Sequence, residues 1–110
     1  MLYCELWSET VAFYRSVLGL SVAFHNDWFV EFQLTSSSFL SIADSARATI
    51  GAVQGQGVTL TWQVVDVGEA RAMLEASGVA MTEIERRWGA DACYCHDPEG
   101  HRIELWSDQI

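Results

Sequence analysis

The chain has 110 residues, of which 15 are acidic and 6 basic, giving a formal net charge of −9 at pH 7. Half of its residues are apolar, so we expect one small folded domain and exclude a disordered chain. The acidic balance argues against nucleic-acid binding, because phosphate contacts need a basic surface. The chain has no run of about 18 apolar residues and begins without a signal-peptide pattern, so we expect a cytoplasmic protein with no membrane partner.

The first half of the chain predicts a strand, a helix and three further strands. A short strand is expected at residues 2–5, and Ser8 or Thr10 is positioned to cap the helix that follows. Apolar residues recur at helical spacing from residue 10 to 18, and Gly19 ends the helix. Three strands are expected next, at residues 21–24, 28–34 and 38–43.

The second half repeats this order. The predicted elements are a strand at 58–65, a helix at 67–76 and strands at 79–84, 92–96 and 102–106. Aligning Val11 with Ala70 places Gly19 on Gly78, so a helix end and a strand start coincide in the two halves. We therefore predict an α+β domain over residues 1–110, made of two βαβββ modules at about 1–46 and 57–110 and joined by a linker at 47–56.

The last two predicted strands form a hairpin. Its Asp-Pro-Glu-Gly turn combines the fixed φ of Pro98 with the tolerance of Gly100 for positive φ. Strand alternation then places Glu104 on the same face as Trp106, where a ligand is expected. The structural alternative for Glu104 is an ordinary polar pairing, for example with Arg102.

The cysteine pattern suits a reducing compartment. The chain has three cysteines, and Cys93 and Cys95 lie two positions apart on a strand, at about the limit of disulfide geometry. A zinc site would need more ligands than one C-x-C pair provides. We interpret the cysteines as small core or surface residues.

The three histidines differ in their expected surroundings. His25 and His101 lie near turns, where we expect them to be solvated or to bond the turn. His96 is placed on the side of the sheet that carries Tyr94 and Glu104. It is therefore the one histidine that we keep as a candidate ligand.

Three parts of the chain share the pattern of one protein family. They are SETVAFYRSVLGL at 8–20, VVD at 64–66, and WG at 88–89 with HDPEGHRIELW at 96–106. Together they resemble the vicinal oxygen chelate superfamily, the group of glyoxalases, bleomycin-resistance proteins and ring-cleaving dioxygenases. The resemblance implies two βαβββ modules, each a curved sheet with one helix on its convex face and a concave face for ligands. It also implies a homodimer, in some members with exchanged modules.

The metal positions of that family are mostly absent. Its metal-dependent members bind a divalent cation through the first and last strands of each module. Glu104 matches the last-strand carboxylate of the second module, but Thr59 falls where the first-strand ligand, usually His, lies. In the first module the closing carboxylate falls near Ser41, and the opening ligand would precede Met1. One carboxylate does not make a metal site, so we expect no cofactor and keep a cation bound by Glu104 and His96 as the alternative.

Aromatic residues give the strongest hint of a ligand. Trp28, Trp88 and Trp106 are expected near the concave faces, and indoles beside carboxylates suit a planar or cationic ligand. Aromatic residues are also enriched in dimer interfaces, which is the competing interpretation. The negative charge likewise fits either a repulsive coat that keeps the protein soluble or the attraction of cationic ligands.

These observations favour a protein of the bleomycin-resistance type. We expect a cytoplasmic homodimer that sequesters a bulky aromatic or cationic small molecule, expected to be an antibiotic, without chemical change and so confers resistance. The alternatives are a metal-dependent lyase or dioxygenase of the same superfamily and a module that serves assembly alone, so enzyme activity stays open. The expected ligand-binding residues are Trp28, Phe39, Thr61, Gln63, Trp88, Tyr94, His96, Arg102, Glu104 and Trp106.

Overall fold

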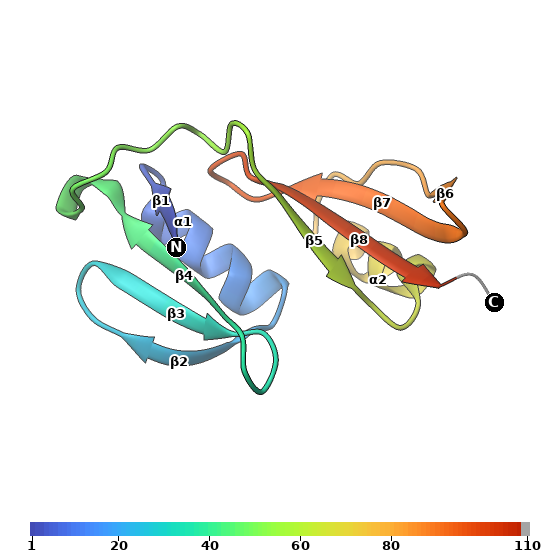
Figure 1. Ribbon diagram of the computed structural model, residues 1–110, viewed down its shortest axis with the longest axis horizontal. Helices are drawn as coiled ribbons and strands as arrows, with labels where there is room; N and C mark the ends of the chain where they lie inside the picture. Colours follow the sequence, from blue (N-terminus) through green and yellow to red (C-terminus); the bar gives the residue numbers. More distant parts are fainter. Residues whose placement is uncertain (109–110) are drawn as a thin grey trace. The chain divides into compact units, whose positions relative to one another are not determined.

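A computed structural model describes residues 1–108, apart from the side chain of Arg87, and these residues form two four-stranded sheets and two α-helices (Figure 1). The chain divides into two compact units: unit 1 holds residues 1–56 and 97–100, and unit 2 holds residues 57–96 and those from 101 onward. Each sheet is built by the order strand, helix, three strands. The predicted α+β fold with two βαβββ modules is therefore confirmed. No helix within residues 1–108 has the length and apolar character needed to cross a bilayer.

Unit 1 carries the first sheet and the first helix. Its elements are β1 (Leu2–Cys4), α1 (Trp7–Ala12), the π-helical turn η1 (Phe13–Val17), β2 (Ser21–His25), β3 (Phe29–Gln33), β4 (Phe39–Asp44) and the 3₁₀ turn η2 (Ser45–Arg47). The strand order is β1-β4-β3-β2, and β1 is parallel to β4. Alternate apolar residues of β3 and β4 are buried together with Phe13 and Tyr14, which form the core of this unit.

The first helix begins at Trp7, earlier than predicted. The prediction that Ser8 or Thr10 caps this helix is wrong. Leu6 is the N-cap residue and its side chain makes no capping bond, while the Thr10 hydroxyl donates to the Leu6 carbonyl oxygen at 2.6 Å. The Leu6 N–H donates instead to Glu99 Oε1 at 2.8 Å. The carboxylate that stabilises this helix start comes from a turn far along the chain, so the local sequence does not show it.

Unit 2 carries the second sheet. Its elements are β5 (Thr59–Gln63), α2 (Val67–Ala76), β6 (Glu85–Arg87), β7 (Ala90–His96) and β8 (Arg102–Asp108), in the strand order β5-β8-β7-β6. The predicted bounds of α2 are confirmed, because Asp66 Oδ1 accepts from the Glu69 N–H at 3.1 Å and Gly78, at φ +91°, follows its end. Buried Leu74, Ile103 and Leu105 belong to the core between α2 and the sheet.

The predicted strand at 79–84 is wrong, because β6 begins only at Glu85. Thr82 still lies beside β7: its N–H donates to the Tyr94 carbonyl at 3.0 Å, and its hydroxyl accepts from the Tyr94 N–H at 2.8 Å. A side-chain oxygen thus occupies the place of the backbone carbonyl that a continuous ladder needs. The residues of this stretch favour a strand by their intrinsic propensity, but they do not form one.

The turn at 97–100 packs against unit 1, although the strands on either side of it belong to unit 2. Asp97 and Glu99 are buried there, and the Tyr14 hydroxyl donates to Asp97 Oδ2 at 2.7 Å. His101, next to the turn, is only 3% exposed. The expectation of a solvated His101 is therefore wrong, because the corner that it flanks is packed and not open to water. His25, at the end of β2, is exposed.

All three cysteines are buried and free, so the interpretation as core residues holds and the surface alternative does not. Burial, together with the charges of Glu99 and Asp97, raises the pKa of the Cys4 thiol to about 12. Burial also raises the pKa of Cys93. Because the thiolate is the reactive form, these thiols are poor nucleophiles.

We expect the native protein to react only slowly with a thiol reagent such as Ellman's reagent at pH 8, whereas the unfolded protein exposes all three thiols. The measurement is the absorbance of released thionitrobenzoate with and without denaturant. Rapid labelling of one thiol per native chain would contradict the packing described for these residues.

Candidate functional site

The sheet of unit 2 has one face covered by α2 and one face opposite to it, which we call the open face. Strand register arranges its side chains in three rows across β5, β8 and β7. The rows are Thr59, Arg102 and His96; Thr61, Glu104 and Tyr94; and Gln63, Trp106 and Ala92. The shared face that strand alternation predicts for Glu104, Trp106 and the β5 residues is therefore confirmed.

A cavity of about 540 Å³ lies on the open face. It is lined by Thr61, Trp88, Ala90, Ala92, Tyr94, Glu104 and Trp106. The alanine methyl groups leave space beside Trp106 that larger side chains would fill. This volume falls within the range of about 300–1,000 Å³ that is usual for small-molecule sites.

Glu104 is a half-buried residue in the lining of this cavity and is held in place by Tyr94. The Tyr94 hydroxyl donates to Glu104 Oε2 at 2.6 Å from the directly opposite position on β7. Among the side chains that the structure describes, none makes a hydrogen bond or ion pair with the other oxygen, Oε1. Glu104 can therefore accept a hydrogen bond from a ligand while Tyr94 keeps the carboxylate oriented.

Arg102 supports Tyr94 and does not pair with Glu104. Its guanidinium lies over the Tyr94 ring, 4.7 Å from the centroid, and its Nε donates to Thr59 Oγ1 at 3.0 Å. The alternative in which Glu104 pairs with Arg102 is not found, because the guanidinium stacks on Tyr94 of the neighbouring strand. The negative charge of Glu104 stays available to a cation.

The structure groups most of the predicted site residues on this face. Thr61, Trp88, Tyr94, Glu104 and Trp106 line the cavity, and Gln63, His96 and Arg102 lie on the same sheet face outside its lining. Trp28 and Phe39 belong to unit 1, where Trp28 packs edge-on against Phe29 with ring centroids 4.7 Å apart and Phe39 is 48% exposed. Ala90 and Ala92 also line the cavity and are not among the residues that the sequence predicts for the site. Strand parity could have found Ala92, but alanine carries no chemical signal.

The donor set on the open face does not fit a divalent metal ion. No group of three or more His, Cys, Asp or Glu side chains is placed to bind a metal within the described part of the chain. His96 pairs with Arg102 in the row next to that of Glu104, whose direct neighbours are Tyr94 and Thr61. Glu104 is thus one carboxylate between two neutral hydroxyl groups, which is fewer carboxylate or imidazole ligands than such ions require.

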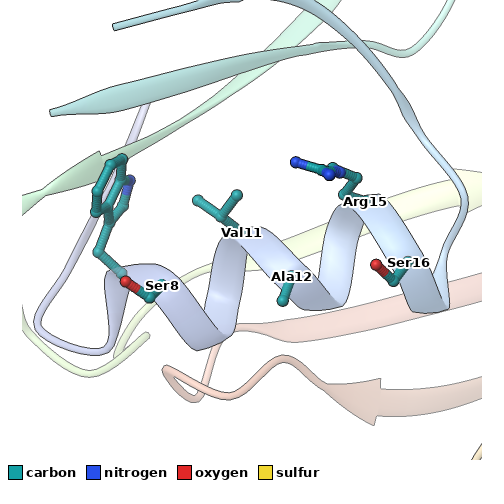
Figure 2. A pocket seen from close by; sticks show the side chains of 6 residues that line it. Ser8, Val11, Ala12, Arg15 and Ser16 are labelled. Carbon is teal, nitrogen blue, oxygen red and sulfur yellow. The ribbon is translucent and has the colours of Figure 1, made fainter. Parts of the chain in front are cut away.

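Another, smaller cavity of about 340 Å³ runs along α1 and η1 in unit 1. Figure 2 shows Val11 and Arg15 along the upper edge of the helix face that lines it, and Ser8, Ala12 and Ser16 along the lower edge of the same face. The indole of Trp7, at its N-terminal end, is held by a hydrogen bond of 2.9 Å to the Ile42 carbonyl. All of its lining residues come from one helical segment, and none of them is an acidic side chain.

The fold defines a class of proteins built from paired βαβββ modules, and comparison with known families agrees. Residues 1–105 match the model of the Glyoxalase/Bleomycin resistance protein/Dioxygenase superfamily. The chain belongs to this superfamily. No curated protein sequence matches it.

Solved structures with the same fold include proteins of different activities. A lactoylglutathione lyase from Agrobacterium tumefaciens has a TM-score of 0.80 and 26% identity, over 96% of this chain and 88% of that one. The antibiotic binding protein TnmS3 from Streptomyces sp. has a TM-score of 0.82 and 18% identity, over 98% and 91% of the two chains. A bleomycin resistance determinant encoded on the transposon Tn5 has a TM-score of 0.77 and 17% identity, over 99% and 94%.

Proposed function

We propose that the chain binds a bulky aromatic or cationic small molecule, in particular an antibiotic, on the open face and sequesters it without chemical change. The observation that carries this proposal is the cavity of about 540 Å³ that combines two indoles, Trp88 and Trp106, with a carboxylate. Stacking on the indoles provides apolar contact. Glu104 Oε1 provides a charged hydrogen-bond acceptor for a cationic group.

The chemistry of the open face supports binding more than catalysis. Glu104, Tyr94 and Thr61 face the cavity, but no activated nucleophile lies beside a base there within the described residues. The similarity to TnmS3 and to the bleomycin resistance determinant is consistent with this proposal. Homodimer formation, exchange of modules and a cytoplasmic location remain predictions.

A metal-dependent lyase is the second candidate. It is favoured by the 26% identity to a lactoylglutathione lyase and by the position of Glu104, which matches the family's last-strand carboxylate. Turnover of lactoylglutathione after addition of Ni²⁺, Fe²⁺ or Mn²⁺, lost in Glu104→Gln, would establish this function in place of sequestration.

The test of sequestration is a tryptophan fluorescence titration of EDTA-treated protein with a panel of DNA-targeting aromatic and glycopeptide antibiotics. We expect saturable quenching by at least one compound and recovery of that compound unchanged. Trp106→Ala should weaken its binding by about tenfold or more, because the variant loses a stacking surface in the cavity.

Trp62→Phe is the matched control, since it also removes one indole but lies in the row of Leu105, on the opposite side of the sheet. Trp62→Phe should change the tryptophan fluorescence of the protein without changing its affinity for the antibiotic. Absence of quenching by every compound, or equal weakening in both variants, would contradict the proposed site.

A further inference from the structure

Trp88 has the most unusual conformation of the residues that line the cavity. Its side chain is fully exposed, at 101% of the reference area, and its φ is +54°. Gly89 follows with φ +79°, and the register pairs Arg87 with Ala90 across these two residues. Two successive positive φ angles between paired residues are typical of a type I′ hairpin turn.

Tryptophan is a poor residue for this turn. Type I′ turns favour Asn-Gly or Asp-Gly, because both central residues need positive φ and bulky side chains resist it. The exposed indole also leaves a large apolar surface in water. Backbone strain and an uncovered aromatic ring beside a cavity indicate a role in binding, since neither feature helps the chain to fold.

The surroundings of Trp88 suit a flat ligand. Trp88 and Trp106 line the same cavity, and between the turn and Tyr94 the strand contributes only alanine methyl groups to the lining. Glu104 lies in the lining as well, with Oε2 occupied by the Tyr94 hydroxyl at 2.6 Å. A planar ring can thus meet indole surfaces while a donor attached to it meets Glu104 Oε1.

We propose that Trp88 closes over the bound molecule and stacks on a planar cationic aromatic ring that carries an amino group, with the amino group bound by Glu104. This inference rests on the function proposed above and narrows its ligand to a flat aromatic cation. Closure removes the indole from water and so offsets the strain of the turn. Tyr94 acts as a positioning residue, because it fixes the carboxylate that meets the amine.

The test uses two probes with the same ring system and opposite charge, 9-aminoacridine and acridine-9-carboxylate, with affinities measured by isothermal titration calorimetry. The wild-type protein should bind the amine about tenfold or more tightly than the carboxylate, and Glu104→Gln should remove most of this preference. Trp88→Asn should weaken binding of 9-aminoacridine by about tenfold, whereas Trp88→Phe, which keeps a flat ring, should stay within about threefold of wild type.

The same Trp88→Asn variant gives a second readout that needs no ligand. Because Asn-Gly is the preferred type I′ sequence, its thermal midpoint should equal or exceed that of the wild type. A clearly lower midpoint would identify Trp88 as a structural residue and overturn the proposal. Dissociation of a dimer in sedimentation, with probe affinity per chain unchanged, would identify it as an interface residue and also overturn the proposal.

We call the stacking of Trp88 over the bound ring the clamp. The clamp and the proposed function fail in different ways. Wild-type affinity for 9-aminoacridine in Trp88→Asn overturns the clamp alone. A wild-type protein that binds members of the antibiotic panel but neither acridine also overturns the clamp alone. A protein that binds none of these compounds overturns the proposed function together with the clamp.

Discussion

Replacing Gly100 with alanine is expected to lower the free energy of unfolding by about 3 kcal/mol or more. A Cβ at this position would lie 2.6 Å from the carbonyl oxygen of Gln54, and the φ of +110° is itself unfavourable for an L side chain. The obstructing atom belongs to the backbone of the segment that connects the two modules. Relief of the clash therefore requires either that segment or the turn at 97–100 to move.

The matched control is Gly19→Ala, at φ +71° with no atom within 4 Å of the added Cβ. It should cost only about 1 kcal/mol, the penalty of the left-handed conformation alone. Urea unfolding followed by circular dichroism measures both variants. Equal losses would show that the turn and residue 54 do not pack as closely as described.

Glu99→Ala is the second substitution with a large expected effect, a loss of about 3 kcal/mol. Glu99 is only 5% exposed, and its Oε1 accepts the Leu6 N–H at the start of α1. Truncation leaves this N–H without its acceptor and opens a cavity beneath the helix. The effect is again measured as a shift of the urea unfolding transition.

The Glu99→Gln variant tests the contribution of the hydrogen bond separately from that of the negative charge. The amide keeps a carbonyl oxygen for the Leu6 N–H, so we expect this variant to be clearly more stable than Glu99→Ala. The pKa of Cys4 should fall below its value of about 12, because the Glu99 charge contributes to that rise, but burial keeps it above the ordinary value. Thiolate absorbance at 240 nm as a function of pH reports this change. An unchanged pKa would contradict the close approach of the two side chains.

The two modules show why some elements are predictable and others are not. The bounds of α2 follow from a local cap at Asp66 and a local stop at Gly78, both present within a few residues of the helix. The start of α1 depends on Glu99, which is 93 positions from Leu6 in the sequence. No window of the sequence around α1 contains that carboxylate, so its start at Trp7 could not be predicted.

The candidate site also combines features that the sequence predicts with features that it does not. Alternation along a strand places Glu104 and Trp106 on one face without any knowledge of the sheet. The partner of Glu104 depends on the register of β7 against β8, which sets Tyr94 directly opposite and leaves Arg102 to stack on the Tyr94 ring. The strain at Trp88 likewise appears only when the backbone angles of the turn are seen.

The amino-acid sequence by itself determined the superfamily, the two βαβββ modules and the acidic, tryptophan-rich character of the chain. These properties depend on local periodicity, turn residues and composition, which act over a few positions. Only the tertiary structure decided how the turn at 97–100 supports α1, and which oxygen of Glu104 is left for a ligand. Those features depend on contacts between residues distant in sequence, where register and burial select one partner among several that the sequence allows.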